Sequence, residues 1–257
     1  ASNNTAVGAD ALKVNTTGTR NVAVGTYALD ANTTANDNTA VGYNSAGAIT
    51  TGVSNTALGA SALLTLTTGS RNTALGYNAL TLQTDASDNT AVGEYAGGAI
   101  TTGANNTLVG GKAGDGITTG GSNTGVGYRA LSAPSFTGSN NVGVGTDALL
   151  ANTTSPNNVA VGYATLDAQT TGAGYNVAVG YNALTANTSG TENTASGWNA
   201  LGANTTGSYN TAYGGGALDA NTTADSNTAI GWKALTENTT GAGNTGIGFQ
   251  ALDANTT

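Results

Sequence analysis

The stretch Asn4-Thr5-Ala6-Val7-Gly8 decides the fold, because variants of it recur fifteen times along the chain. Successive copies lie 17 residues apart twelve times and 18 residues apart twice. A period held this strictly indicates a repeat protein whose units stack on their neighbours. We expect residues 1–257 to form a single repeat domain, a fragment of a longer protein, with repeats that start at Asn4, Asn21, Asn38, Asn55, Asn72, Asn89, Asn106, Asn123, Asn141, Asn158, Asn176, Asn193, Asn210, Asn227 and Asn244.

Each repeat alternates its side chains as a short β-strand does. If the Asn is position 1, position 2 is Thr or Val, position 3 is mostly Ala, position 4 is aliphatic in thirteen copies and position 5 is always Gly. Alternation with a period of two places positions 2 and 4 on one face of a strand, and we expect that face to point into the coil. The Ala-Leu pair at positions 8 and 9 predicts a second short strand whose Leu points the same way.

This pattern favours an all-β fold, a parallel β-solenoid (β-roll) of about fifteen coils of 17 residues. The Asn-Thr-Thr-Gly tract near position 12 has the chemistry of a turn, and a repeat so rich in Gly and β-branched residues does not suit a helix. Three copies that lack the Leu at position 9 carry an Ile at position 12, which we interpret as a compensating core residue. The expected core is Val7, Leu12, Val24, Leu29, Val41, Ile49, Leu58, Leu63, Leu75, Leu80, Val92, Ile100, Val109, Ile117, Val126, Val144, Val161, Val179 and Leu184.

Opposite charges one repeat apart support the stacking. In a solenoid these residues are neighbours on successive coils, so their pairing reports register, although an exposed ion pair contributes only about 0–1 kcal/mol. The expected inter-coil pairs are Lys13 with Asp30, Arg20 with Asp37, Arg71 with Asp88, and Arg129 with Asp147.

The small residues at position 3 indicate an oligomer. A strand position that faced solvent would accept larger polar residues, whereas a row of alanines suits close contact with another chain. The alternative is that these alanines face inward in a cramped single coil. The residues assigned to the chain interface are Ala6, Ala23, Ala40, Ala57, Ala74 and Ala91.

Aromatic residues occupy position 6 in eight copies. They form either a structural ladder or a strip for contact with a glycan or another surface, for which the candidates are Tyr163, Tyr181, Trp198 and Trp232. The Asn-x-Thr sequons at Asn15, Asn32, Asn152, Asn204 and Asn238 would be outward glycan acceptors in a host that glycosylates, and otherwise are turn residues.

Composition removes several kinds of chemistry. The chain has no Cys and no His, which excludes disulfides, thiolate metal sites and His-based triads. Its net charge of −8 disfavours nucleic acid, and no apolar run is long enough for a membrane span. We therefore expect no catalytic residues, no metal, no cofactor and no enzymatic activity.

The run Asn176-Val177-Ala178-Val179-Gly180, followed by Tyr181-Asn182-Ala183-Leu184, resembles known repeats. It is similar to the head repeats of trimeric autotransporter adhesins, whose core reads Asn-Ser-Val-Ala-Ile-Gly, and to repeats of phage tail-fibre proteins. The resemblance implies a trimeric, left-handed parallel β-roll located at a cell surface, outside the cell or on a virion.

The function expected from these observations is the structural shaft of an extracellular or virion fibre or adhesin. Its partners would be further copies of the chain, as a homotrimer or a filament, together with a cell-surface glycan or receptor. Two alternatives remain: a self-assembling extracellular matrix filament, and an ice-binding β-solenoid that uses the Thr rows at positions 2, 13 and 14.

Overall fold

The computed structural model describes all 257 residues and contains only short β-strands and turns. Contacts divide the chain into two compact units, Ala1–Val126 and Gly127–Thr257. The strands of the first unit are β1 (Thr5–Val7), β2 (Val22–Val24), β3 (Thr39–Val41), β4 (Thr56–Leu58), β5 (Thr73–Leu75), β6 (Thr90–Val92), β7 (Thr107–Val109) and β8 (Thr124–Val126). Those of the second are β9 (Val142–Val144), β10 (Val159–Val161), β11 (Val177–Val179), β12 (Thr194–Ser196), β13 (Thr211–Tyr213), β14 (Thr228–Ile230) and β15 (Thr245–Ile247).

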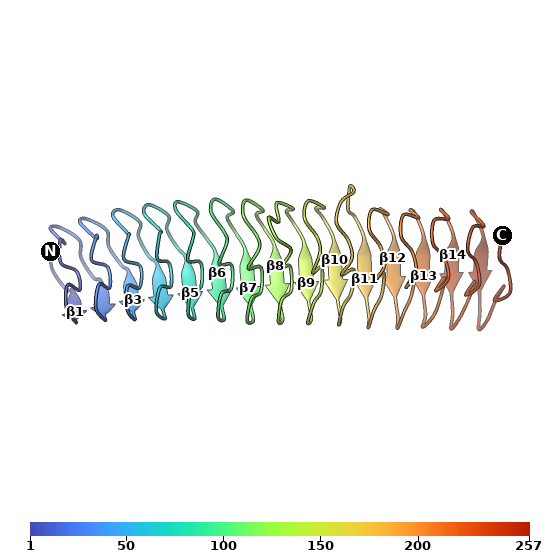
Figure 1. Ribbon diagram of the computed structural model, residues 1–257, viewed down its shortest axis with the longest axis horizontal. Helices are drawn as coiled ribbons and strands as arrows, with labels where there is room; N and C mark the ends of the chain where they lie inside the picture. The colour runs from blue at the N-terminus through green and yellow to red at the C-terminus, as the bar shows by residue number, and fades with distance from the viewer. The chain divides into compact units, whose positions relative to one another are not determined.

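Each unit is a parallel β-solenoid, with one strand of three residues per coil. Within each unit the strands pair in chain order and in register, for example Thr39 with Thr56 in the first and Val177 with Thr194 in the second. In Figure 1 the strands of each unit lie side by side, and turns close each coil. The predicted all-β solenoid of 17-residue coils is confirmed.

The 18-residue step between β10 and β11 is absorbed outside the strands. Val159 still pairs with Val177, so the sheet keeps its register. The extra residue lies in the corner around Gly172 and Gly174, which have φ angles of 109° and 81°. This corner protrudes beyond its neighbours in Figure 1. An inserted residue therefore changes a turn and leaves the ladder intact.

The core lies on the opposite face of the strand from the one predicted. Alanines at position 3, such as Ala40 and Ala178, are fully buried, whereas Val179 beside Ala178 is 40% exposed. A coil with one short strand has a narrow interior, and a methyl group fills it opposite the Leu of position 9. The assignment of position 4 to the core was wrong, and its side chains are exposed or half-buried: Val7, Val24, Val41, Leu58, Leu75, Val92, Val109, Val126, Val144, Val161 and Val179.

The other predicted core positions are confirmed, except Leu12 in the first coil. The position-9 residues Leu29, Leu63, Leu80 and Leu184 are fully buried, and Leu12 is half-buried. The three compensating isoleucines are also fully buried: Ile49, Ile100 and Ile117.

The Ala-Leu pair forms a turn, so the second strand predicted there was wrong. Leu29 has a φ of 49°, in the left-handed region, and its N–H donates to the carbonyl of Ser45 on the next coil at 3.2 Å. Tyr27, two residues earlier, is also left-handed, with a φ of 61°. Two left-handed residues in close succession bend the chain sharply, so alternation over two residues was too short a signal for a strand.

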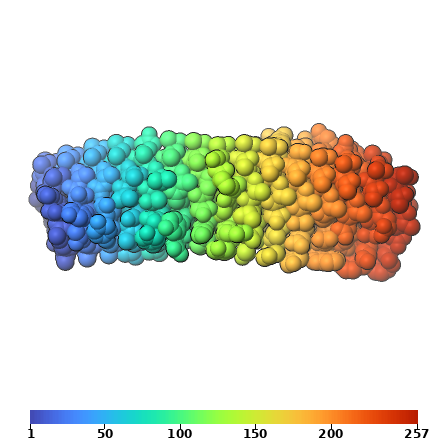
Figure 2. All heavy atoms as spheres, viewed as in Figure 1, coloured from blue at the N-terminus to red at the C-terminus, as the bar shows by residue number.

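The invariant Gly at position 5 has two structural reasons. Gly145 has a φ of 127°, which residues with a Cβ rarely adopt. A Cβ there would also overlap the carbonyl oxygen of Gly162 on the next coil. Successive coils therefore meet backbone to backbone at this corner, and Figure 2 shows their atoms packed closely within each unit.

The Asn at position 1 forms a buried ladder of amides. Asn193 is fully buried, and its Nδ2 donates to the carbonyl of Gly207 at 2.8 Å. Its Oδ1 accepts the backbone N–H of Asn210 at 3.0 Å, and its own N–H donates to Oδ1 of Asn176 at 3.0 Å. Each Asn thus closes its own coil and fixes the backbone of the next, as amide ladders do in cross-β structures.

Candidate functional surfaces

The outer face of the sheet carries a row of exposed aliphatic side chains. In the first unit Leu58 is 43% exposed and Leu75 is 39% exposed, and in the second unit Val179 and Ile230 are 40% and 39% exposed. Position 2 adds Thr and Val side chains to the same face, such as Val177, which is 39% exposed. Contiguous apolar surface of this kind marks an interaction site more often than a solvated face.

The alanines assigned to a chain interface lie elsewhere. Ala6 in β1 is exposed, but the others are fully buried inside their own coils and cannot touch a second chain: Ala23, Ala40, Ala57, Ala74 and Ala91. Their small size reflects the narrow interior of the coil. The interface assignment was therefore wrong for these five residues, and the inward alternative holds.

Three of the four predicted ion pairs between coils are present. Arg20 donates to Asp37 through two nitrogens, at 2.6 and 2.8 Å. The hydrogen bond and the charge of Arg20 lower the pKa of Asp37.

The second pair repeats this geometry. Arg71 and Asp88 also lie 2.6 Å apart, and the pKa of Asp88 is lowered by the same hydrogen-bonding effect. Arg129 donates to Asp147 at 2.8 Å across an 18-residue step. These pairs place charged columns in the register that the repeat predicted.

The pair Lys13–Asp30 was wrong. Lys13 lies 3.3 Å from Asp10 of its own coil, three residues away in sequence. A flexible ammonium reaches a carboxylate on the same turn as easily as one on the next coil, whereas the planar guanidinium of an Arg favours a bidentate partner.

Aromatic side chains at position 6 are exposed and some of them stack. Tyr163 and Tyr181 are on successive coils, with ring centroids 5.3 Å apart and planes at 13°. Trp198 and Trp232 are two coils apart, yet their centroids are only 6.3 Å apart and their planes meet at 15°. The structure therefore brings the four glycan candidates together as two stacked pairs on one side of the second unit.

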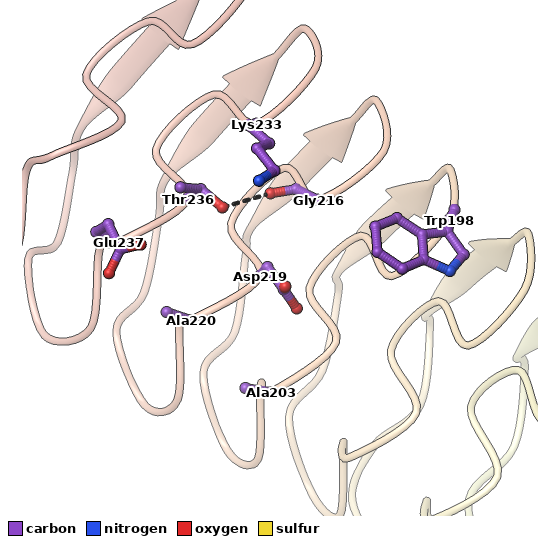
Figure 3. Close-up of a pocket in the computed structure, with 8 residues that line it drawn as sticks. All are labelled: Trp198, Ala203, Gly216, Asp219, Ala220, Lys233, Thr236 and Glu237. Carbon is purple, nitrogen blue, oxygen red and sulfur yellow. Dashed lines mark hydrogen bonds between the residues drawn. The ribbon is translucent and has the colours of Figure 1, made fainter.

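A pocket of about 400 Å³ lies beside Trp198. Figure 3 shows its lining, in which the Thr236 hydroxyl donates to the carbonyl of Gly216 at 3.0 Å. Asp219 accepts a hydrogen bond from Nδ2 of Asn199 at 2.6 Å, and Lys233 and Glu237 complete the charged part of the lining. Sequence analysis missed this pocket, although its signal is present as three consecutive glycines at Gly214-Gly215-Gly216 between two Trp-containing repeats.

Burial raises the pKa of Asp219, while the hydrogen bond from Asn199 and the charge of Lys233 oppose that rise. Asp167 on another coil behaves similarly, because burial raises its pKa and a hydrogen bond from Thr185 lowers it. A second acidic group adds to the rise in each case, Glu237 for Asp219 and Asp147 for Asp167.

The sequons do not present outward glycan acceptors at the repeat turn. Asn32, Asn152, Asn204 and Asn238 are fully buried. The Nδ2 of Asn204, for example, donates to the carbonyl of Gly207 at 3.0 Å, so the nitrogen that would carry a glycan faces the coil interior. Asn15 is half-buried, and its Nδ2 donates to the carbonyl of Gly18 at 3.1 Å. The expectation of outward acceptors was wrong, and these residues are structural parts of the turn.

No group of three or more metal-ligating side chains is clustered in the structure. It also has no helical segment with the length and hydropathy of a membrane span.

The geometry defines a parallel β-solenoid repeat protein with an exposed aliphatic sheet face. Comparison of the chain with protein-family models, characterised proteins and solved structures found no match.

Proposed function

We propose that this chain is the structural shaft of an extracellular or virion fibre or adhesin, and that three copies pack side by side as a coaxial homotrimer. The repeat supplies length, because within each unit a coil is hydrogen-bonded to the next through the backbone and the Asn ladder. The resemblance of the repeat to adhesin heads and phage tail fibres supports the same function. In this role the chain is a scaffold and not an enzyme.

The observation that carries the proposal is the exposed aliphatic row at position 4. The strands are parallel and in register, so the row repeats from coil to coil in the first unit and is interrupted in the second only by Ser196 and Tyr213. An in-register face of this kind matches the same face of another copy coil by coil. Burial of apolar area at about 25 cal/mol per Å² would favour the assembly, and closed rotational symmetry would leave no part of the row exposed.

The strands β10, β11 and β14 allow a matched test. One variant carries Val161→Asp, Val179→Asp and Ile230→Asp, which place charges on the outer face. The control carries Ala160→Asp, Ala178→Asp and Ala229→Asp, one residue earlier in each strand, where the side chain is fully buried.

Mass is measured by light scattering and folding by circular dichroism. The proposal predicts three chains per particle for the unmodified protein, single folded chains for the outer-face variant and an unfolded control, because buried unpaired charges are strongly unfavourable. A single chain for the unmodified protein, or a trimer that survives the outer-face substitutions, would contradict the proposed interface. Very large, polydisperse particles would instead favour the matrix filament.

A regular row of Thr side chains favours ice binding as a second candidate. Thr188, Thr205 and Thr222 occupy position 13 of successive coils, and the first two hydroxyls donate to the carbonyl of the next Thr in the row at 3.1 and 2.9 Å. Ice binding needs a regular, outward hydroxyl array. Thermal hysteresis from a monomeric protein would support this candidate, and its absence would exclude it.

A further inference from the structure

The pocket beside Trp198 exists because one coil lacks two side chains. Positions 6 and 7 carry Trp198 and Asn199 on one coil and Trp232 and Lys233 two coils later. On the coil between them both positions are Gly. The gap lies on the turns, away from the strand face.

The two glycines open the site in different ways. A Cβ on Gly215 would come within 2.5 Å of the Trp232 ring, so this Gly lets Trp232 lean across towards Trp198. A Cβ on Gly216 would have only one neighbour within 4 Å, the Cγ of Lys233 at 3.3 Å. The missing side chain at Gly216 therefore leaves open space, and the pocket lies there.

The lining combines an aromatic wall, a small apolar floor and charged hydrogen-bonding groups. Trp198 is 52% exposed and borders the pocket. Ala203 and Ala220 leave the floor shallow, while the Asp219 and Glu237 carboxylates accept hydrogen bonds and the Lys233 ammonium donates them. Figure 3 shows the side chains of Asp219, Lys233 and Glu237 at separate places around the pocket.

We propose that this pocket binds a neutral pyranose unit of a glycan. The C–H groups on one face of a pyranose carry partial positive charge, and they complement the negative face of the Trp198 indole. The hydroxyls at the edge of the ring can donate to Asp219 and Glu237 and accept from Lys233. A volume of about 400 Å³ lies in the range of small-ligand sites and accommodates one or two sugar units.

The charge of the lining selects against acidic sugars. Two carboxylates face one ammonium in the pocket, and the whole chain has a net charge of −8. A sialylated or sulfated unit would add a negative charge to this field, whereas a neutral unit would not. The site goes beyond the shaft function and does not depend on it, because none of its lining residues belongs to a strand.

Intrinsic fluorescence tests the proposal, because the only two Trp residues of the chain, Trp198 and Trp232, form the stacked pair at this site. The unmodified protein is titrated with the methyl glycosides of glucose, galactose, mannose and N-acetylglucosamine, and with glucose 6-sulfate. We expect a saturable change with at least one neutral glycoside and an affinity for glucose 6-sulfate at least tenfold weaker.

Gly216→Asn is the decisive variant. Gly216 has a φ of 66°, and Asn199 holds the same position of the preceding coil with a φ of 55°, so Asn fits the backbone and fills the pocket. We expect this variant to fold and to bind at least tenfold more weakly. The control replaces Tyr163 and Tyr181 with Ala and should keep the affinity.

Three results would overturn the proposal: no response to any neutral glycoside, full affinity in a folded Gly216→Asn variant, or loss of binding in the tyrosine control. Light scattering on the same samples reports the chain number separately, so failure of the glycan site and failure of the shaft assembly are distinguishable.

Discussion

Replacement of Asn193 by Ala tests whether the amide ladder holds successive coils together. The substitution removes two principal contacts, the acceptor of the Asn210 backbone N–H and the Nδ2 donor to Gly207. It also removes two longer contacts, of 3.2 Å to Nδ2 of Asn210 and 3.3 Å to Oδ1 of Asn176. Gly207 keeps a second donor, Nδ2 of Asn204 at 3.0 Å, so its carbonyl stays satisfied. The Asn210 N–H, in contrast, loses the partner that the structure shows for it.

The magnitude follows from these two losses. A buried N–H left without an acceptor costs about 1–3 kcal/mol, and loss of the hydrogen bond to Gly207 costs a further net amount of about 0.5–1.5 kcal/mol. We therefore expect a destabilisation of about 2–4 kcal/mol. The matched control is Thr188→Ala on the preceding coil, which removes one exposed hydrogen bond to Thr205 and should change the stability by no more than about 0.5 kcal/mol.

The assay is denaturant unfolding at one fixed protein concentration, followed by circular dichroism and Trp fluorescence. Hydrogen exchange then reports whether the loss is centred on the coils around Asn193, as expected for a repeat protein in which neighbours contribute separately. If Asn193→Ala were no more destabilising than Thr188→Ala, the reasoning that assigns cohesion to the amide ladder would be refuted.

Three further outcomes follow from the structure. Gly145→Ala should destabilise the folded protein by more than about 2 kcal/mol, because the backbone φ is positive there and the new Cβ would overlap the next coil. Gly143→Ala restores the usual position-3 residue and should be tolerated. Thermal melts of both variants check this. Leu80→Ala should cost about 2–5 kcal/mol by leaving a cavity, and equal stability of the variant in denaturant would show that the coil collapses around it. Burial raises the pKa of Asp219 above its ordinary 3.8, so protonation of Asp219 favours the folded state. The stability that this protonation contributes is lost as the pH rises from 3.8 through the raised pKa, and the melting temperature should fall over this pH range. Asp219→Asn should flatten that fall, and an unchanged pH profile would contradict the assignment.

The period predicted most of the fold, because stacking follows directly from spacing. The 17-residue step placed Arg20 beside Asp37, and the missing Leu in one repeat pointed to the buried Ile49. Local conformation was harder to predict. Leu29 adopts a left-handed φ that pattern analysis does not anticipate for a branched apolar residue.

The choice of strand face could not be made from alternation alone. Alternation separates Ala178 from Val179, but it does not state which side is the interior. The usual rule, that the larger apolar residue is buried, fails in a coil too narrow for two large residues across from each other. A chain interface that covers Val179 would restore that rule at the level of the assembly, which is why the exposed row supports the proposed trimer.

The candidate site was only partly predictable. The exposed aromatic residues Trp198 and Trp232 were identified from position 6, but the pocket depends on what Gly216 lacks. An absent side chain becomes informative only when the neighbouring coils show which side chain would otherwise occupy that place.

The Asn ladder also makes length a variable that evolution or an engineer can change freely. Away from the 18-residue steps, the ladder Asn contacts residues 14 and 17 positions along the chain, as Asn193 and Asn210 both do. A duplicated or deleted whole repeat would therefore break and re-form the same contacts at one junction and leave all others unchanged. Because the typical sequence separation of contacts stays fixed, a longer chain need not close longer loops to fold. The number of repeats can thus be changed by copying a short stretch of the gene, and the added coils fold through the same contacts as the existing ones.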